Sequence, residues 1–493
     1  MKKIESLWGM VIAMLLMLAF QDANAQVTAR VEYPMDKEHG DILMLPMEKQ
    51  GVAAMYFPKR DRNDEQDFVI DFYDTNLKLK NTEKVKVAPR VDFGYRIYED
   101  GVQYVVLTEK KGTCDILKFD TRTAKASVVH AQLDQKRCSF YHPLVADGKL
   151  VFTSESGAGR NAEEHVGIID LTTGESRFVE VKPEDVRSRD FDLKECTVID
   201  HVIYALMSIK NDIYLKRIDM EGKVLETICI AKESRERLLS TSISKAGNEL
   251  FMTGTYTTDK KRGRSQGIYF AKLGKEGFDF IKFYNYLDLN NFTEYMSDRK
   301  KAKVERRKEK AEKNDKEMSV NMLMTSHKIL EKNGAYYYVG EAYEPVYRTY
   351  YSGRMAYTEF VGYEYSHAII VKFDKLGEKV WDSCFPMHPS RRPYFVKHFV
   401  TVGFQNNQVN AIYGDRKLLV SKFFSDTDGS VVKERTKEVL DTNDEEDDVK
   451  KASSTDIEYW YGNNFMVSGY QVVKNKANGE RRRVLYINKY TIE

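Results

Sequence analysis

Short runs of alternating hydrophobic and polar residues recur along the chain after residue 26, and turn residues bound most of them. Alternation with a period of two predicts β-strands that bury one face. The most regular runs begin near positions 51, 101, 148, 201, 248, 334, 407 and 463. Their spacing of about 50 residues, with two wider gaps, predicts one structural unit repeated along the chain.

Each unit also contains two apolar runs joined by a short polar turn. Examples are CDILKFDTRTAKASVV from Cys114, VGIIDLTTGESRFVEV from Val166, DIYLKRIDMEGKVLETICI from Asp212 and AIIVKFDKLGEKVWDSCF from Ala368. Such pairs are typical of β-hairpins. Four short strands per unit predict the blades of a β-propeller. We therefore expect an all-β chain forming a single propeller of eight blades, or seven if two units merge. A pair of β-sandwiches is the alternative, but it does not require the same unit eight times.

This organisation resembles exported bacterial β-propeller repeat proteins in general, and the resemblance covers nearly all of residues 26–493. No specific family is indicated, because the chain lacks a regular G-H…W-D pair, a double glycine of the kelch type and a repeated Asp-box. The resemblance implies a rigid scaffold whose loops carry the function. It does not select a function, because propellers include enzymes, lectins and scaffolds.

The last unit is one strand short. Its strands are expected near 456–461, 464–472 and 483–492, where the sequence ends. The alternating segment 27–33 precedes the first full unit and can supply the missing strand. Because an unpaired sheet edge is a liability, we expect this segment to close the propeller against the last blade.

The first 25 residues have the pattern of a signal peptide. Two lysines are followed by the apolar run LWGMVIAMLLMLAF and then by Ala23-Asn24-Ala25. A basic start, a short apolar stretch and an A-x-A site are typical of cleaved export signals. We therefore expect residues 26–493 to form the propeller domain, located in the periplasm or at the cell surface, and not membrane-spanning after cleavage.

Charge and motif content exclude several functions. Lys and Arg number 77 and Asp and Glu 75, and this near-neutral balance argues against nucleic-acid binding. No G-x-S-x-G or H-E-x-x-H motif occurs, and the nine His and five Cys are scattered. No metal site and no cofactor are predicted. The acidic run at 441–448 lacks the EF-hand pattern, and we expect it to be a solvated turn.

Three segments interrupt the repeat. Residues 288–319 read as a highly charged helix with almost no apolar face, which would be a solvated arm or a basic tether. Residues 342–367 are rich in Tyr and Arg, the residue types enriched in recognition surfaces, and would be either a long hairpin packed on its own blade or a binding segment. Residues 387–396 follow closely and read MHPSRRPYFV. If the ring topology is right, all three segments should crowd one sector of one face.

The second and third segments supply the predicted binding site. The residues expected to contact a ligand are Tyr347, Arg348, Tyr350, Tyr351, Arg354, Tyr357, His388, Arg391 and Arg392. The favoured function is an exported binding or scaffold propeller that recognises a glycan or a protein partner. The alternative is a carbohydrate-active enzyme with its site in the central channel, which would require two facing carboxylates. A structural part of an envelope complex is a third reading.

Overall fold

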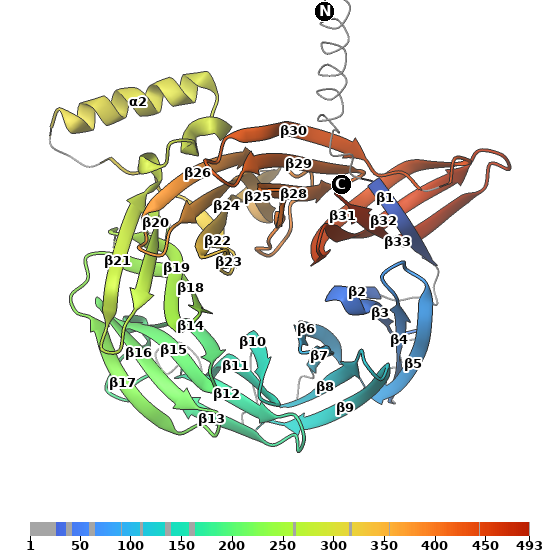
Figure 1. Ribbon diagram of the computed structural model, residues 1–493, viewed down its shortest axis with the longest axis horizontal. Coiled ribbons are helices and arrows are strands. Elements are labelled where there is room, and N and C mark those ends of the chain that lie inside the picture. The colour runs from blue at the N-terminus through green and yellow to red at the C-terminus, as the bar shows by residue number, and fades with distance from the viewer. Residues whose placement is uncertain are drawn as a thin grey trace, which may run out of the picture.

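The computed structural model describes residues 26–35, 42–58, 65–89, 91–108, 112–133, 140–156, 163–259, 263–314, 318–353, 355–442 and 444–492. Within them, the strands form eight antiparallel sheets that follow one another around a ring (Figure 1). The expectation of an all-β chain built from four-stranded units is confirmed. The predicted signal peptide lies outside the described residues.

The first four sheets are regular meanders of four strands, each in sequence order from the inside of the ring to the outside. The first sheet contains β2 (Ile42–Met47), β3 (Gly51–Tyr56), β4 (Gln66–Tyr73) and β5 (Leu79–Val87). The second contains β6 (Asp92–Glu99), β7 (Val102–Thr108), β8 (Thr113–Asp120) and β9 (Lys125–Gln132). The third contains β10 (Tyr141–Ala146), β11 (Lys149–Ser156), β12 (Glu163–Asp170) and β13 (Ser176–Glu180). The fourth contains β14 (Phe191–Ile199), β15 (Val202–Ile209), β16 (Asp212–Asp219) and β17 (Val224–Ala231).

The remaining sheets carry the additions. The fifth contains β18 (Arg237–Ala246), β19 (Glu249–Thr257), β20 (Gly267–Leu273) and β21 (Phe278–Asn285). The sixth contains β22 (Leu323–Ser326), the short β23 (Leu330–Lys332), the long β24 (Ala335–Ser352) and β25 (Met355–Phe373), and β26 (Lys379–Pro386). The seventh contains β27 (Thr401–Gln405), β28 (Gln408–Asp415), β29 (Leu418–Ser425) and β30 (Val431–Val439). The eighth contains β31 (Asp447–Tyr461), β32 (Asn464–Asn475), β33 (Arg481–Thr491) and, on its outer edge, β1 (Gln26–Pro34).

Local sequence explains the tight connections between first and second strands. Asp100-Gly101 and Asp147-Gly148 both adopt positive φ, with values of 42° and 75° in the first pair and 51° and 71° in the second. Two consecutive left-handed residues make the turn that matches the twist of a β-hairpin, and Asp-Gly is a favoured pair there. The second strands consequently begin within a residue of the positions that the pattern predicts.

Hydrophobic residues pack between neighbouring sheets. Among the described residues there are eight such clusters, and one of them joins the eighth sheet to the first. In that cluster Trp460 and Leu485 pack with Met44 and Val52. The core is therefore a ring of interfaces between sheets, and each sheet is held from both sides.

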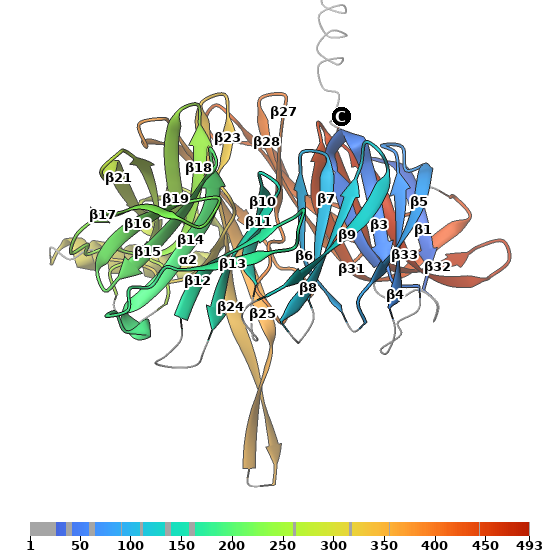
Figure 2. The same cartoon turned by 90° about the horizontal axis from the view of Figure 1, so that it is seen from below.

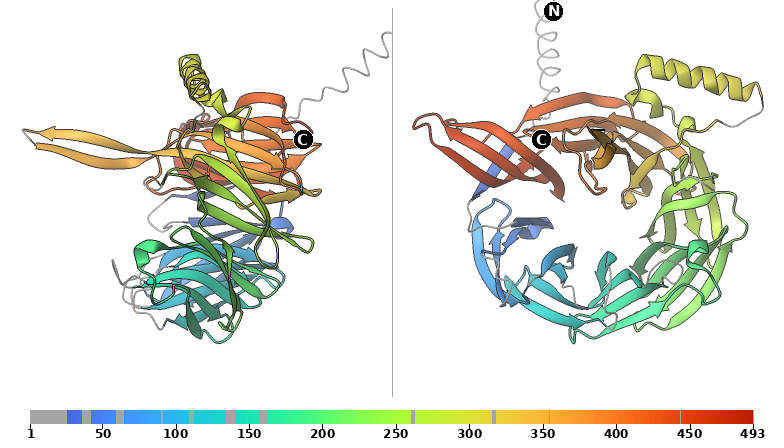
Figure 3. Two further views of the ribbon diagram at one scale, coloured as in Figure 1. Left: turned by 90° about the vertical axis from the view of Figure 1, so that its left-hand side faces the viewer. Right: turned by 180° about the vertical axis from the view of Figure 1, so that it is seen from behind.

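The charged insertion is confirmed as a helix but is shorter than the predicted segment. The 3-10 turn η4 (Tyr286–Asp288) leads into it, and it contains the 3-10 turn η5 (Phe292–Tyr295) and the helix α2 (Asp298–Glu312). No residue of α2 is buried. Figures 1 and 3 show α2 on the outer side of the ring, while the β24–β25 hairpin projects from one face. The three interrupting segments are therefore not gathered in one place, because η5 packs on β26 and directs α2 outward.

Segment 26–34 pairs with the last sheet as its alternating pattern suggests. β1 runs antiparallel to β33, with Val31 opposite Ile487 and Tyr33 opposite Leu485. The acidic run contributes to the same sheet, because Asp447 and Asp448 begin β31. The expectation of a solvated turn is wrong for Asp447, which is buried and forms an ion pair with Arg482.

Candidate functional site

The β24–β25 hairpin leaves the sixth sheet and continues as a two-stranded ribbon that projects from the ring (Figure 2). β24 is buried from Tyr336 to Ala342 and exposed from Tyr347 to Ser352. β25 mirrors this pattern and is exposed over 355–359. We call residues 346–360, apart from residue 354, the arm. Figure 2 shows its two strands extending beyond the other strands that the structure describes.

Aromatic side chains cover both faces of the arm. Tyr347 lies opposite Phe360, and Tyr350 lies opposite Tyr357. Because successive residues of a strand point to opposite faces, these two pairs lie on opposite sides of the ribbon. Tyr351 is 80% exposed, and Tyr347 is 61% exposed. Large exposed aromatic surfaces of this kind mark interaction sites.

The base of the arm is braced against the ring. The Arg264 guanidinium donates to both carboxylate oxygens of Glu344 at 2.5 and 2.6 Å. The Tyr363 amide donates to the Pro393 carbonyl at 2.8 Å. Tyr343, Tyr363 and Phe360 form a chain of edge-on ring contacts that leads from the sheet into the arm. The direction in which the arm points is therefore fixed by the ring.

Residues 387–396 lie on the same face as the arm base and divide into two parts. Arg392 pairs with Glu364 at 3.2 Å, and Tyr394 contacts Phe360 with ring centroids 6.1 Å apart. Tyr394 and Phe395 are each 69% exposed, so the exposed aromatic surface extends from the arm onto the ring. His388 leads instead toward the seventh sheet, where its amide donates to the Tyr413 hydroxyl.

The predicted site residues thus occupy three positions. Tyr347, Arg348, Tyr350, Tyr351 and Tyr357 lie on the arm, and Arg392 lies at its base. His388 and Arg391 lie on the exposed surface of the ring. Arg354, at the turn of the arm, lies outside the described residues. The sequence missed Phe395, although its place beside Tyr394 in an insertion was an available signal.

A second group of polar residues surrounds the centre of the ring. The innermost strands β10, β14, β18 and β22 line a cavity of about 580 Å³. His142, Glu195, Lys328 and His398 contribute to its wall. A smaller cavity of about 220 Å³ adjoins it between the third and fourth sheets and adds Glu155 and Glu164. The sequence pattern singles out none of these residues, because they come from separate strands and from the loops that contain Lys328 and His398, and they share no local motif.

The surroundings of this cavity shift the pKa values of several side chains that line it. Burial raises the pKa of Glu195 to about 7, although the nearby Lys328 ammonium opposes the shift. Burial also raises the pKa of Glu164 to about 7, and the negative charges of Asp192 and Glu155 add to the effect. The surrounding protein and the neighbouring His327 ring lower the pKa of His398 to about 4. At neutral pH the wall therefore contains neutral imidazole and partly protonated carboxyl groups.

One carboxylate in this region has a structural role. Glu341 is fully buried and accepts hydrogen bonds from the amides of Phe399 and Val400. His327 lies 2.8 Å from the same carboxylate and stacks on His398 with ring centroids 3.9 Å apart. Glu341 thus fixes the two histidines and joins the sixth sheet to the seventh.

Within the described part of the chain, no three His, Cys, Asp or Glu side chains are grouped so that they could hold a metal ion. No helix among the described residues has the length and hydrophobicity needed to cross a bilayer.

Comparison with known proteins adds little beyond the fold. No family model and no curated protein matches the chain. Similar solved structures include the dihydro-heme d1 dehydrogenase NirN in complex with DHE, with a TM-score of 0.43 and 9% identity over 94% of this chain and 79% of that one. The WD40 domain of SCAP from fission yeast gives a TM-score of 0.39 and 7% identity over 94% and 98% of the two chains. A prolyl endopeptidase gives a TM-score of 0.39 and 10% identity over 82% of this chain.

The chain spans half the length of that endopeptidase. Similarity this weak carries no information on function, which has to be inferred from the residues of this chain. Fold and surface together define a β-propeller protein with a projecting aromatic arm.

Proposed function

We propose that this protein is an exported binding β-propeller that holds a protein partner with its arm. The observation that carries the proposal is the exposed aromatic surface of residues 346–360, which projects from the ring on a braced base. An isolated two-stranded ribbon is marginally stable in water, and its aromatic side chains gain most by being covered. A partner that encloses the arm supplies that cover.

Three properties of the arm favour a protein over a glycan. The aromatic pairs lie on both faces, whereas a sugar ring stacks on one face of a platform. The arm is convex and fits into a groove, and it offers two unpaired strand edges for β-augmentation. Tyr350 and Tyr357 combine apolar rings with hydroxyl groups, as residues at protein interfaces commonly do.

The ring that carries the arm is part of the same proposal. We infer that the eight sheets are the eight blades of one propeller, and that β1 closes it by joining the eighth sheet. The inter-sheet cluster of Trp460, Leu485, Met44 and Val52 supports this inference, since it links the last sheet to the first.

We also infer export to the periplasm or cell surface from residues 1–25. N-terminal sequencing of the protein purified from its native cells should begin at Gln26.

The experiment that tests the arm is affinity capture with chemical cross-linking from the native envelope. Wild type is compared with a variant in which residues 346–360 are replaced by a two-residue Asn-Gly turn. We expect a protein cross-linked to the wild type to be absent from the variant. The matched control replaces the exposed Val224 and Leu225 on β17 with serine, which leaves the arm intact. The same protein captured by wild type and by the armless variant would refute the proposal.

The enzyme alternative is less well supported. A glycosidase needs two carboxyl groups about 5–10 Å apart, and at that distance each shifts the pKa of the other. Glu164 and Glu195 border the same small cavity. However, the charges that influence Glu164 are Asp192, Glu155 and Lys194, and the charge that influences Glu195 is Lys328. Glu164 therefore interacts with the carboxylates of Glu155 and Asp192 and not with Glu195, and the enzyme reading rests on no carboxyl pair of known separation.

A further inference from the structure

The centre of the ring contains a cavity that the arm does not use. Its main part, of about 580 Å³, is bordered by strands of the third to sixth sheets and by residues 396 and 398. The adjoining part, of about 220 Å³, shares five lining residues with it, from His142 to Cys196. The two parts therefore form one continuous space of the size that small-molecule sites have.

Irregularities in two innermost strands shape this wall. The pairing of β14 with β15 shifts register between Leu193 and Glu195, so Lys194 is the extra residue of a bulge. The pairing of β10 with β11 shifts between Tyr141 and Leu144, and His142 within it has φ of 50°. Bulges commonly re-aim side chains beside functional sites, and strained backbone gathers at ligand sites.

The polar groups of the wall are available to a ligand. Among the described residues, the Glu195 carboxyl accepts a backbone hydrogen bond from Cys196, and the exposed Lys328 ammonium acts on it electrostatically. The Thr197 hydroxyl and the Tyr343 ring also line the space, whereas the Thr325 hydroxyl is already hydrogen-bonded to the His398 imidazole at 2.9 Å. The Glu195 side chain is half-buried and has no side-chain hydrogen bond among the described residues, so a ligand in the cavity can reach its carboxyl group.

We propose that this channel cavity binds a neutral polyhydroxylated ligand of the sugar class. A sugar hydroxyl both donates and accepts, and it is matched by groups that do both: threonine hydroxyls, neutral imidazoles and a carboxyl that is partly protonated at neutral pH. The wall carries the carboxyl groups of Glu155, Glu164, Asp192 and Glu195 against the ammonium groups of Lys194 and Lys328, so it offers a polyanion no excess of positive charge. A purely apolar ligand would leave these polar groups unpaired. The inference is independent of the partner proposed for the arm.

The test is saturation-transfer NMR on the purified full chain, followed by calorimetry. The probes are a panel of neutral hexoses, pentoses, N-acetylhexosamines and their short oligomers, with glucuronate and inorganic phosphate as anionic probes. Glu195→Leu and Lys328→Met remove the two available groups and keep apolar side chains of similar length. Glu184→Gln, in an exposed loop away from the cavity, is the matched control.

We expect at least one neutral saccharide to bind the wild type and the Glu184→Gln control equally. The affinity should fall by about tenfold or more in each cavity variant, as expected for loss of a hydrogen bond to a titratable group. If Glu195→Leu does not fold, the exposed Lys328→Met decides the question alone. The proposal is overturned if no neutral saccharide binds, if only an anionic probe binds, or if binding is unchanged in the folded cavity variants.

Discussion

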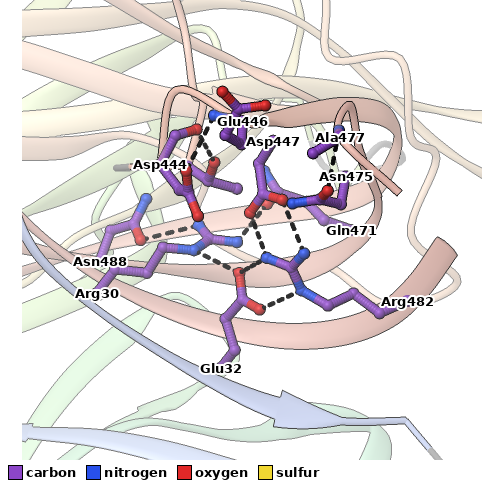
Figure 4. Close-up of polar contacts among 11 residues, drawn as sticks. Arg30, Glu32, Asp444, Glu446, Asp447, Gln471, Asn475, Ala477, Arg482 and Asn488 are labelled. Atoms are coloured by element: carbon purple, nitrogen blue, oxygen red, sulfur yellow. Dashed lines mark hydrogen bonds and ion pairs between the residues drawn. The ribbon is translucent and has the colours of Figure 1, made fainter. Parts of the chain in front are cut away.

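Two regions of the molecule are built from long strands and differ in how their side chains are satisfied. The first is the seam, which we define as β1 with its contacts to β33 and to the first sheet. Figure 4 shows Arg30, Glu32, Arg482 and Asp447 linked there by ion pairs and hydrogen bonds. The second is the arm, where Tyr350 and Tyr351 face solvent. At the seam the charged side chains are paired within the chain, whereas Tyr350 and Tyr351 of the arm remain 44% and 80% exposed.

This contrast between paired and exposed side chains indicates which residues stabilise the fold and which are free to bind a partner. At the seam, Arg30 donates to Glu32 at 2.9 Å, to Asn488 at 3.0 Å and to Gln471 at 2.7 Å, with its side chain 7% exposed. Each of these bonds adds to folding stability only because both partners are already in place. On the arm, the tyrosines gain little within the folded chain. We therefore expect seam substitutions to reduce stability and arm substitutions to reduce binding.

The largest expected effect is on stability and comes from Arg30→Ala. The substitution removes the donor to two buried amide oxygens and the cation that stacks on the Tyr486 ring at 4.6 Å. Loss of one partner from a nearly buried network should lower the free energy of unfolding by about 3 kcal/mol, measured by guanidinium denaturation. Arg122→Ala, at an exposed pair with Asp120, is the control and should leave the free energy of unfolding nearly unchanged. Equal losses in the two variants would contradict the comparison.

A smaller loss of stability is expected from Tyr33→Phe. The Tyr33 hydroxyl on β1 donates to Asp71 at 2.9 Å and lies 2.5 Å from the Tyr73 hydroxyl, so it ties the eighth sheet to the first. Asp71 keeps Thr82 and Tyr56 as donors. We expect a loss of about 1–2 kcal/mol by the same measurement. Tyr357→Phe on the arm is the matched control, and an equally large loss there would show that the arm is also held internally.

The sequence predicts these two regions unequally, for a physical reason. The aromatic insertion could be recognised because its residues are neighbours in the chain and interrupt a regular repeat, but its projection from the ring as a ribbon could not be predicted. The position of β1 could be predicted because alternation is local and a missing strand has to be supplied. The seam network could not, because Asp447 meets Arg482 across a β-strand register that no short segment determines. Asp447 also sits in an acidic run that resembles a solvated turn.

The channel residues were unpredictable for a related reason. His142, Glu195 and Lys328 come from three different sheets, and their convergence depends on the curvature of the whole ring. The bulge at Lys194 also breaks the alternation from which inward-facing residues are predicted. The local sequence pattern therefore predicts the strands of this fold. Which residues line the central cavity depends on how the sheets are arranged, which the pattern does not predict.

Acid should weaken the seam more than the arm. Hydrogen bonds from Arg482 and Arg30 outweigh burial and hold the pKa of Glu32 below its ordinary value, and the Arg482 guanidinium lowers the pKa of Asp447. A lowered folded-state pKa contributes stability above the ordinary value of about 4. This contribution is lost as pH falls through the lowered value. Denaturation midpoints should therefore decline below about pH 4.5, and less steeply in Glu32→Gln. An unchanged slope in Glu32→Gln would show that other carboxylates control acid unfolding.

The smallest expected effect on stability is that of the double substitution Tyr350→Ser and Tyr351→Ser on the arm. Both side chains are largely exposed, at 44% and 80%, so the folded chain loses little buried surface. The free energy of unfolding should change by no more than about 0.5 kcal/mol. Tyr337→Ser, at a fully buried position of β24, is the control within the same strand and should cost about 3 kcal/mol or more. Capture of the partner should nevertheless fall for the double variant, because the lost aromatic surface is what a partner would cover. A large loss of stability in the double variant would mean that the arm is part of the folded core. The distinction between a seam that stabilises the fold and an arm that binds a partner would then be wrong.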